Sequence, residues 1–81
     1  MQVIRDNFIY KYQKKATEWE GCTDSRSVFV NIYKLIISGL DEMIEKDVQS
    51  IAVKVGFESH INTLEATMKD ILERMGQYEK N

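Results

Sequence analysis

Two side chains are the natural candidates for catalytic chemistry in this sequence, because His60 and Cys22 are each the single residue of their type. Nucleophilic catalysis requires a nucleophile, a base and an orienting group held in contact. No motif in the sequence brings His60 to Cys22 or to a serine, and there is no nucleophile elbow. We therefore expect no catalytic residue and no enzymatic activity, and we expect His60 to be an exposed residue in the first turn of a helix.

The residues that could bind a metal ion do not have the spacing of ligands. A second ligand on the same helix as His60 would lie three or four residues away, where the sequence has Thr63 and Leu64. The acidic clusters at 41–45 and 70–73 lack the glycine-centred loop that a calcium site requires. We expect neither a metal ion nor any other cofactor.

The composition indicates one soluble, folded domain that covers residues 1–81. Hydrophobic residues make up 43% of the chain and charged residues 30%, which is too apolar for a disordered protein. One cysteine cannot form an internal disulfide, and no signal segment opens the chain, so we expect a cytoplasmic protein. The longest nearly apolar run, 28–40, is shorter than the ~20 residues that span a bilayer, so no membrane span is expected.

The apolar periodicity predicts an all-α fold. Apolar residues recur at steps of three or four along the chain, and no run alternates strictly with period two. We predict long helices at 2–20, 25–46 and 59–78, and a short helix that Asp47 caps and Gly56 ends. The helix at 25–46 is apolar over a wide arc, which is typical of a helix with neighbours on more than one side. The predicted fold is a small bundle of three long helices and one short helix, with the helix at 25–46 central.

Two apolar surfaces exceed what the predicted core requires. Val28 and Leu35 lie outside the broad apolar face of their helix, beside Gly39, which marks either a close backbone approach or a tolerated weak position. The helix at 59–78 has a narrow apolar seam of the kind that meets a partner helix. A chain this short buries only about 60–65% of its unfolded surface, so these surfaces favour association. The candidate interface residues are Val28, Leu35, Ile61, Leu64, Met68, Ile71 and Met75.

These features predict a small non-catalytic, intracellular protein that binds another protein through helical surfaces. The commonest way to cover spare apolar surface is a two-fold symmetric dimer, so we expect a homodimer. Tyr10 and Trp19 are expected to be exposed aromatic residues that could anchor a partner. Proteins of this size and class often act as regulators or inhibitors, and we expect such a role from that association.

The segment 51–59 supports an alternative function. Its sequence, IAVKVGFES, resembles the helix-turn-helix of AraC-type transcriptional activators, which often reads isoleucine-alanine, two variable residues, valine-glycine-phenylalanine and then a small polar residue. The resemblance implies two helices that meet at a turn near Gly56, and a DNA-binding transcriptional regulator that uses residues 48–70. The matching residues are Ile51, Ala52, Val55, Gly56, Phe57 and Ser59.

A DNA-reading helix must also present donors to base edges and to phosphates. If Gly56 occupies the turn, the second helix should be apolar at positions 62 and 65, but its apolar residues come at 61 and 64. The chain has 11 basic and 13 acidic residues, a net charge of −2, whereas non-specific DNA affinity comes mostly from basic groups. Nucleic acid is therefore the second choice of partner, after another protein. The candidate DNA-contacting residues are His60, Asn62, Thr63 and Lys69.

Overall fold

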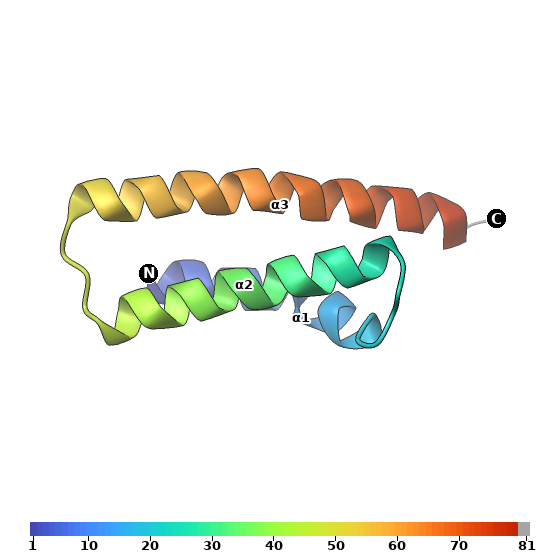
Figure 1. Cartoon of the computed structure of the whole chain (residues 1–81), viewed down its shortest axis with the longest axis horizontal. Coiled ribbons are helices and arrows are strands. Elements are labelled where there is room, and N and C mark those ends of the chain that lie inside the picture. Colours follow the sequence, from blue (N-terminus) through green and yellow to red (C-terminus); the bar gives the residue numbers. More distant parts are fainter. Residues whose placement is uncertain (80–81) are drawn as a thin grey trace.

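The computed structural model describes residues 1–79, with side chains up to Met75, and forms three α-helices in this range: α1 (Gln2–Glu18), α2 (Ser25–Glu45) and α3 (Ile51–Glu79). α2 runs antiparallel to α1 and to α3, and the three helices form a rod of 47 × 19 × 19 Å (Figure 1). No strand occurs in the part of the chain that the structure describes. The predicted all-α fold and small helical bundle are confirmed.

The predicted division of 48–78 into a short helix and a long one is wrong, because α3 is continuous through Gly56. Glycine inside a helix costs only about 1 kcal/mol relative to alanine. Phe57, directly after Gly56, packs against the core one turn before the buried Ile61. The packing of Phe57 against α2 therefore offsets the weak helix propensity of Gly56.

Ser50, rather than Asp47, caps the start of α3. The backbone N–H of Val53 donates to Ser50 Oγ at 3.3 Å, which is the usual N-cap contact. Asp47 has a φ of 50°, and its N–H donates to Ile44 O at 3.2 Å, so it belongs to the end of α2. The carboxylate of Asp47 accepts from Gln49 Nε2 at 2.8 Å. Local hydrogen bonds thus hold the short connection between α2 and α3.

α2 is the central helix, as its wide apolar arc predicts, because it packs against both α1 and α3. Aromatic rings fill much of the layer between α1 and α2, where the rings of Trp19 and Phe29 lie 5.0 Å apart at 74°. Trp19 is buried, so the prediction that it is an exposed anchor is wrong, whereas Tyr10 is 91% exposed. The buried apolar residues are Phe8, Tyr12, Ala16, Trp19, Phe29, Val30, Ile36, Leu40, Ile61, Met68 and Ile71.

α1 closes one edge of the α2–α3 pair with polar contacts as well as apolar ones. The hydroxyl of Tyr12 donates to Glu65 Oε2 on α3, and Arg5 Nε donates to Asp41 Oδ1 on α2. Burial, followed by the hydrogen bond to Glu65 and its negative charge, raises the pKa of Tyr12 well above its usual range. The Tyr12 hydroxyl therefore stays protonated above the pH at which an ordinary tyrosine titrates, and its hydrogen bond to Glu65 ties α1 to α3.

α3 comes close to α2 at Gly39, on the opposite edge of the pair. A Cβ atom placed on Gly39 would meet Cζ of Phe57 at 2.6 Å. The sequence left two interpretations open for this glycine, a close backbone approach and a tolerated weak position. The structure shows a close approach, but the group that approaches is the aromatic ring of Phe57 and not a second backbone.

Candidate functional site

The two candidate catalytic side chains lie on different elements. Cys22 is half-buried in the connection between α1 and α2, whereas His60 is exposed on α3. Among the described residues, no three His, Cys, Asp or Glu side chains gather closely enough to hold a metal ion. Cys22 and His60 therefore do not share a site, and residues 1–75 contain no such candidate metal cluster.

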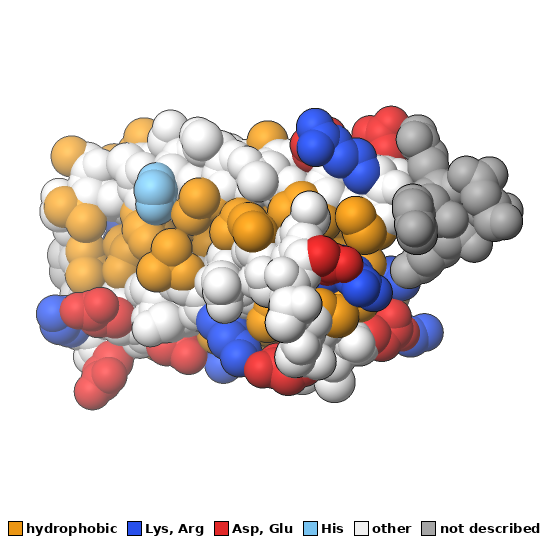
Figure 2. Space-filling view, turned by 45° about the vertical axis from the view of Figure 1, so that its right-hand side comes forward, with side chains coloured by type: hydrophobic (Ala, Val, Ile, Leu, Met, Phe, Trp, Pro, Cys, Tyr) orange, Lys and Arg blue, Asp and Glu red, His pale blue; other side chains and the backbone are white. Residues whose placement is uncertain are grey.

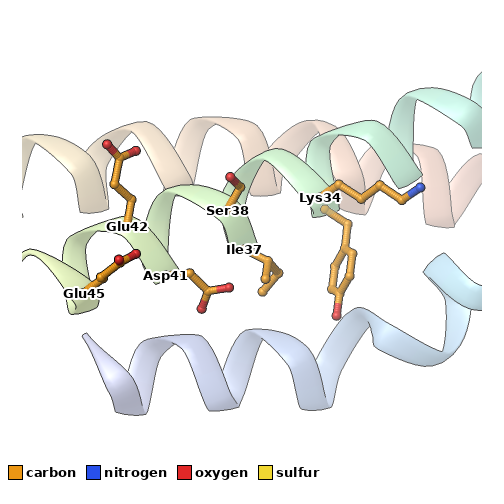
Figure 3. Close-up of a pocket in the computed structure, with 7 residues that line it drawn as sticks. Lys34, Ile37, Ser38, Asp41, Glu42 and Glu45 are labelled. Atoms are coloured by element: carbon orange, nitrogen blue, oxygen red, sulfur yellow. The ribbon is translucent and has the colours of Figure 1, made fainter.

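One hollow, of ≈ 480 Å³, has an acidic lining on the outer side of α2. Figure 3 shows that its carboxylates diverge, because Asp41 points toward α1 and Glu42 points away from it. Asp41 accepts from Arg5, and Glu42 accepts from Lys46 Nζ at 2.7 Å, a hydrogen bond that lowers the pKa of Glu42. This surface is ion-paired helix exterior. The lining residues are Tyr33, Lys34, Ile37, Ser38, Asp41, Glu42 and Glu45.

The narrow apolar seam predicted for α3 is filled within the chain. Ile61, Met68 and Ile71 are buried in the core, and Leu64 and Met75 are partly buried and pack against it. These five candidate interface residues therefore hold α3 on α2, and only the partly buried ones retain surface for a partner.

The other two candidate interface residues are exposed, on the edge of α2 that α1 does not cover. Leu35 is 59% exposed and Val28 is 45% exposed. They are seven positions apart, which places both on the same side of the helix. The sequence therefore identified this apolar surplus correctly.

A second hollow, of ≈ 190 Å³, lies between α2 and α3 beside Leu35. Phe57 and Leu64 line it from α3 and are partly exposed, and Gly39 forms part of its floor. Hydrophobic side chains gather in a band along this side of the molecule, next to the single histidine (Figure 2). We call this surface the open face and define it as Val28, Leu35, Gly39, Phe57, His60 and Leu64.

Charged side chains are nearly absent from the hollow of the open face. Glu42 is the one carboxylate in its lining, no lysine or arginine lines it, and the carboxylate of Glu42 is ion-paired to Lys46. Charged residues make up 30% of the whole chain. Depletion of charge around exposed apolar side chains is the compositional mark of an interface centre.

Phe57 is the residue of the open face that sequence reasoning assigned to a different role, as the apolar contact of a helix end at Gly56. The steps from Val28 to Ile32, Leu35 and Gly39 are four, three and four residues, which is the spacing of a second seam on α2. The sequence thus already places Gly39 beside Leu35, but no local pattern indicates that Phe57 of α3 packs over this glycine.

The structure does not bring the four candidate DNA-contacting residues together on one face. All four are exposed on α3, but His60 lines the hollow between α2 and α3, whereas Asn62 lines a groove beside α1. Lys69 lies seven residues after Asn62 and shares its side, and Thr63 Oγ1 donates to Ser59 O at 3.1 Å within α3. The turn that the AraC-type resemblance implies at Gly56 is absent, because α3 runs through it.

No helix in the described part of the chain is long and apolar enough to cross a membrane. No protein-family model, curated protein or solved structure matches the chain.

Proposed function

We propose that this chain is a small non-catalytic helical module that binds another polypeptide through the open face. A cytoplasmic regulator or inhibitor of a partner protein is the class of protein that fits such a module. The single observation that carries the proposal is the exposure of Leu35, 59%, directly beside a hollow that Phe57 and Leu64 line.

The energetics favour a partner at this position. Full burial of a leucine side chain contributes about 1.5–3 kcal/mol relative to leaving it in water. The lining of the hollow contains no lysine or arginine, and its one carboxylate, Glu42, is ion-paired to Lys46. A partner that covered Leu35 and this hollow would therefore not remove an unpaired charge from water. The desolvation penalty that opposes burial of charged surface is therefore small here.

Photocrosslinking from the open face tests this function and captures the partner in the same experiment. A benzophenone amino acid replaces Leu35 in the cells that make the protein naturally, and a matched variant carries it at Val55. Val55 is 58% exposed, so the two probes are equally accessible, but Val55 does not line the hollow. We expect irradiation to attach position 35, and not position 55, to a polypeptide in stoichiometric yield.

Mass spectrometry of the crosslinked product then identifies the attached chain. A second polypeptide at position 35, whether a different protein or another copy of this chain, supports the proposed function. Equal and low yields at positions 35 and 55 would show that the open face has no polypeptide partner and would overturn it.

A further inference from the structure

We infer that the occupant of the open face is a second copy of this chain, related by a two-fold axis that sets the two α2 helices antiparallel. The inference rests on the proposed function, since it names the polypeptide that covers the open face. Three observations carry it: the spacing of the seam on α2, the distribution of charge along α2, and the accessible area of the chain.

The seam on α2 has the spacing that two antiparallel helices need to interdigitate. Val28, Ile32, Leu35 and Gly39 follow steps of four, three and four residues, as alternating core positions of a coiled coil do. When the two-fold axis passes midway between positions 32 and 35, Leu35 of one chain lies against Ile32 of the second copy. The same register sets Val28 against Gly39 of the second copy, where Val28 would meet the ring of Phe57 that covers this glycine.

The charge distribution permits a copy of the same sequence to dock. A two-fold axis brings side chains near the axis close to their own copies, so a self-complementary surface must keep unpaired charges away from it. Lys34 is level with the proposed axis, but it lies outside the lining of the hollow and is ion-paired to Glu20. Glu42 is the one carboxylate of the hollow, and it lies about 8 to 9 residues, or roughly 13 Å, along α2 from the proposed axis. Two such carboxylates are then separated by well over the Debye length of about 8 Å at physiological salt.

The accessible area of the chain leaves room for such an interface. A monomeric protein of 9.5 kDa is expected to expose about 5,000 Å², whereas this chain exposes 5671 Å². An interface at the lower end of the stable range buries about 600 Å² of each chain, and burial of that much would bring the exposed area of this rod-shaped chain to the value expected for a compact monomer.

Disulfide trapping tests the occupant and its orientation together. Cys22 is first replaced by serine, and a single cysteine is then introduced by Leu35→Cys, Val28→Cys or Val55→Cys. A disulfide needs Cα atoms within about 7 Å. In the antiparallel register, the two copies of position 35 lie within about 5 Å along the helix axis, whereas the two copies of position 28 lie about 16 Å apart.

We expect mild oxidation to convert the Leu35→Cys protein to a covalent dimer at least tenfold faster than the Val28→Cys and Val55→Cys proteins. Fast dimerisation of Val28→Cys with itself would overturn this register, because an antiparallel pair with its two-fold axis between positions 32 and 35 keeps the two copies of position 28 about 16 Å apart along the helix axis. Equally slow oxidation of all three variants would overturn the second copy as occupant. That result, together with photocrosslinking of position 35 to a different protein, would leave the proposed function standing.

Discussion

The ring of Phe57 lies directly over Gly39, so that a Cβ atom at position 39 would come within 2.6 Å of Cζ of the ring. This relationship explains why a glycine stands in the middle of the central helix. Gly39 and the ring of Phe57 also form the floor of the open face. A larger residue at position 39 would displace the ring and fill the hollow between α2 and α3.

Replacement of Gly39 by alanine should therefore have an effect that depends on Phe57. In a Phe57→Ala background, Gly39→Ala should stabilise the protein by about 1 kcal/mol, because alanine has the higher helix propensity. In the natural background the clash with the ring should cancel this gain. A double-mutant cycle measured by urea unfolding reports the difference as a coupling energy. Equal stabilisation in both backgrounds would show that the ring does not occupy the space over Gly39.

Truncation of Leu40 or Ile36 to alanine should destabilise the protein by about 2–5 kcal/mol, because both side chains are buried in the central helix. Val55→Ala is the matched control, since Val55 is exposed, and its effect should stay within about 0.5 kcal/mol. The free energy of unfolding from urea titration at low protein concentration is the measurement. Small effects at both Leu40 and Ile36 would mean that α2 is not central.

Tyr12→Phe should make the protein less stable at neutral pH and less sensitive to alkali. The change removes a hydrogen bond to the carboxylate of Glu65, which costs roughly 1–3 kcal/mol. Because the pKa of Tyr12 is raised in the folded state, its contribution is fully present below the ordinary tyrosine value of about 10 and is lost as the pH rises through the folded value.

The measurement for Tyr12 is the free energy of unfolding between pH 8 and pH 11. The natural protein should lose more stability over this interval than the Tyr12→Phe variant does. Tyr10→Phe serves as the control, because Tyr10 is 91% exposed and its removal should leave the alkaline decline unchanged. Parallel declines in all three proteins would contradict the burial of the Tyr12 hydroxyl against Glu65.

Asp24 should control the acid sensitivity of the start of α2. Hydrogen bonds from the Arg26 side chain and then from its backbone N–H lower the pKa of Asp24 from 3.8 to about 2. A lowered folded pKa means that the contribution of Asp24 is present above its ordinary value and is lost as the pH falls from about 4 toward 2. Asp24→Ala should be less stable than the natural protein at pH 7 and should lose less stability over that acid interval.

Asp24→Asn separates the cap from the charge, because an asparagine side chain can still accept from the Arg26 backbone N–H. It should retain more stability at pH 7 than Asp24→Ala while losing the acid dependence. An unchanged acid limb in both variants would show that Asp24 contributes no pH-dependent stability.

The sequence predicted the core of α2 and the apolar surplus at Leu35 because both follow from the 3.6-residue period alone. The same period shows which side of α3 is apolar but not which helix packs against that side. It could therefore not decide whether Met68 packs within the chain or between chains. The structure places Met68 in the core of the single chain. Helical periodicity therefore located the faces, and only the packing assigned each face its neighbour.

The helix end predicted at Gly56 failed for a related reason. A glycine is a weak local signal of about 1 kcal/mol, and burial of one large apolar side chain contributes more than that. Phe57 packs into the gap over Gly39, which is distant in the sequence, and no local pattern contains that contact. The continuity of α3, and with it the absence of a turn for a helix-turn-helix, depends on tertiary packing that the sequence pattern does not encode locally.

The measurement that tests the central claim most directly is sedimentation equilibrium across low to high micromolar concentrations for the natural protein, Leu35→Glu and Val55→Glu. We predict that the natural protein and Val55→Glu approach twice the chain mass of 9.5 kDa, whereas Leu35→Glu remains at 9.5 kDa with an unchanged helical circular dichroism spectrum. Position 35 lies on the open face and position 55, of equal exposure, does not line its hollow. A natural protein that stays at 9.5 kDa at every concentration, or a Leu35→Glu variant that associates as well as Val55→Glu, would contradict docking of a second copy on the open face.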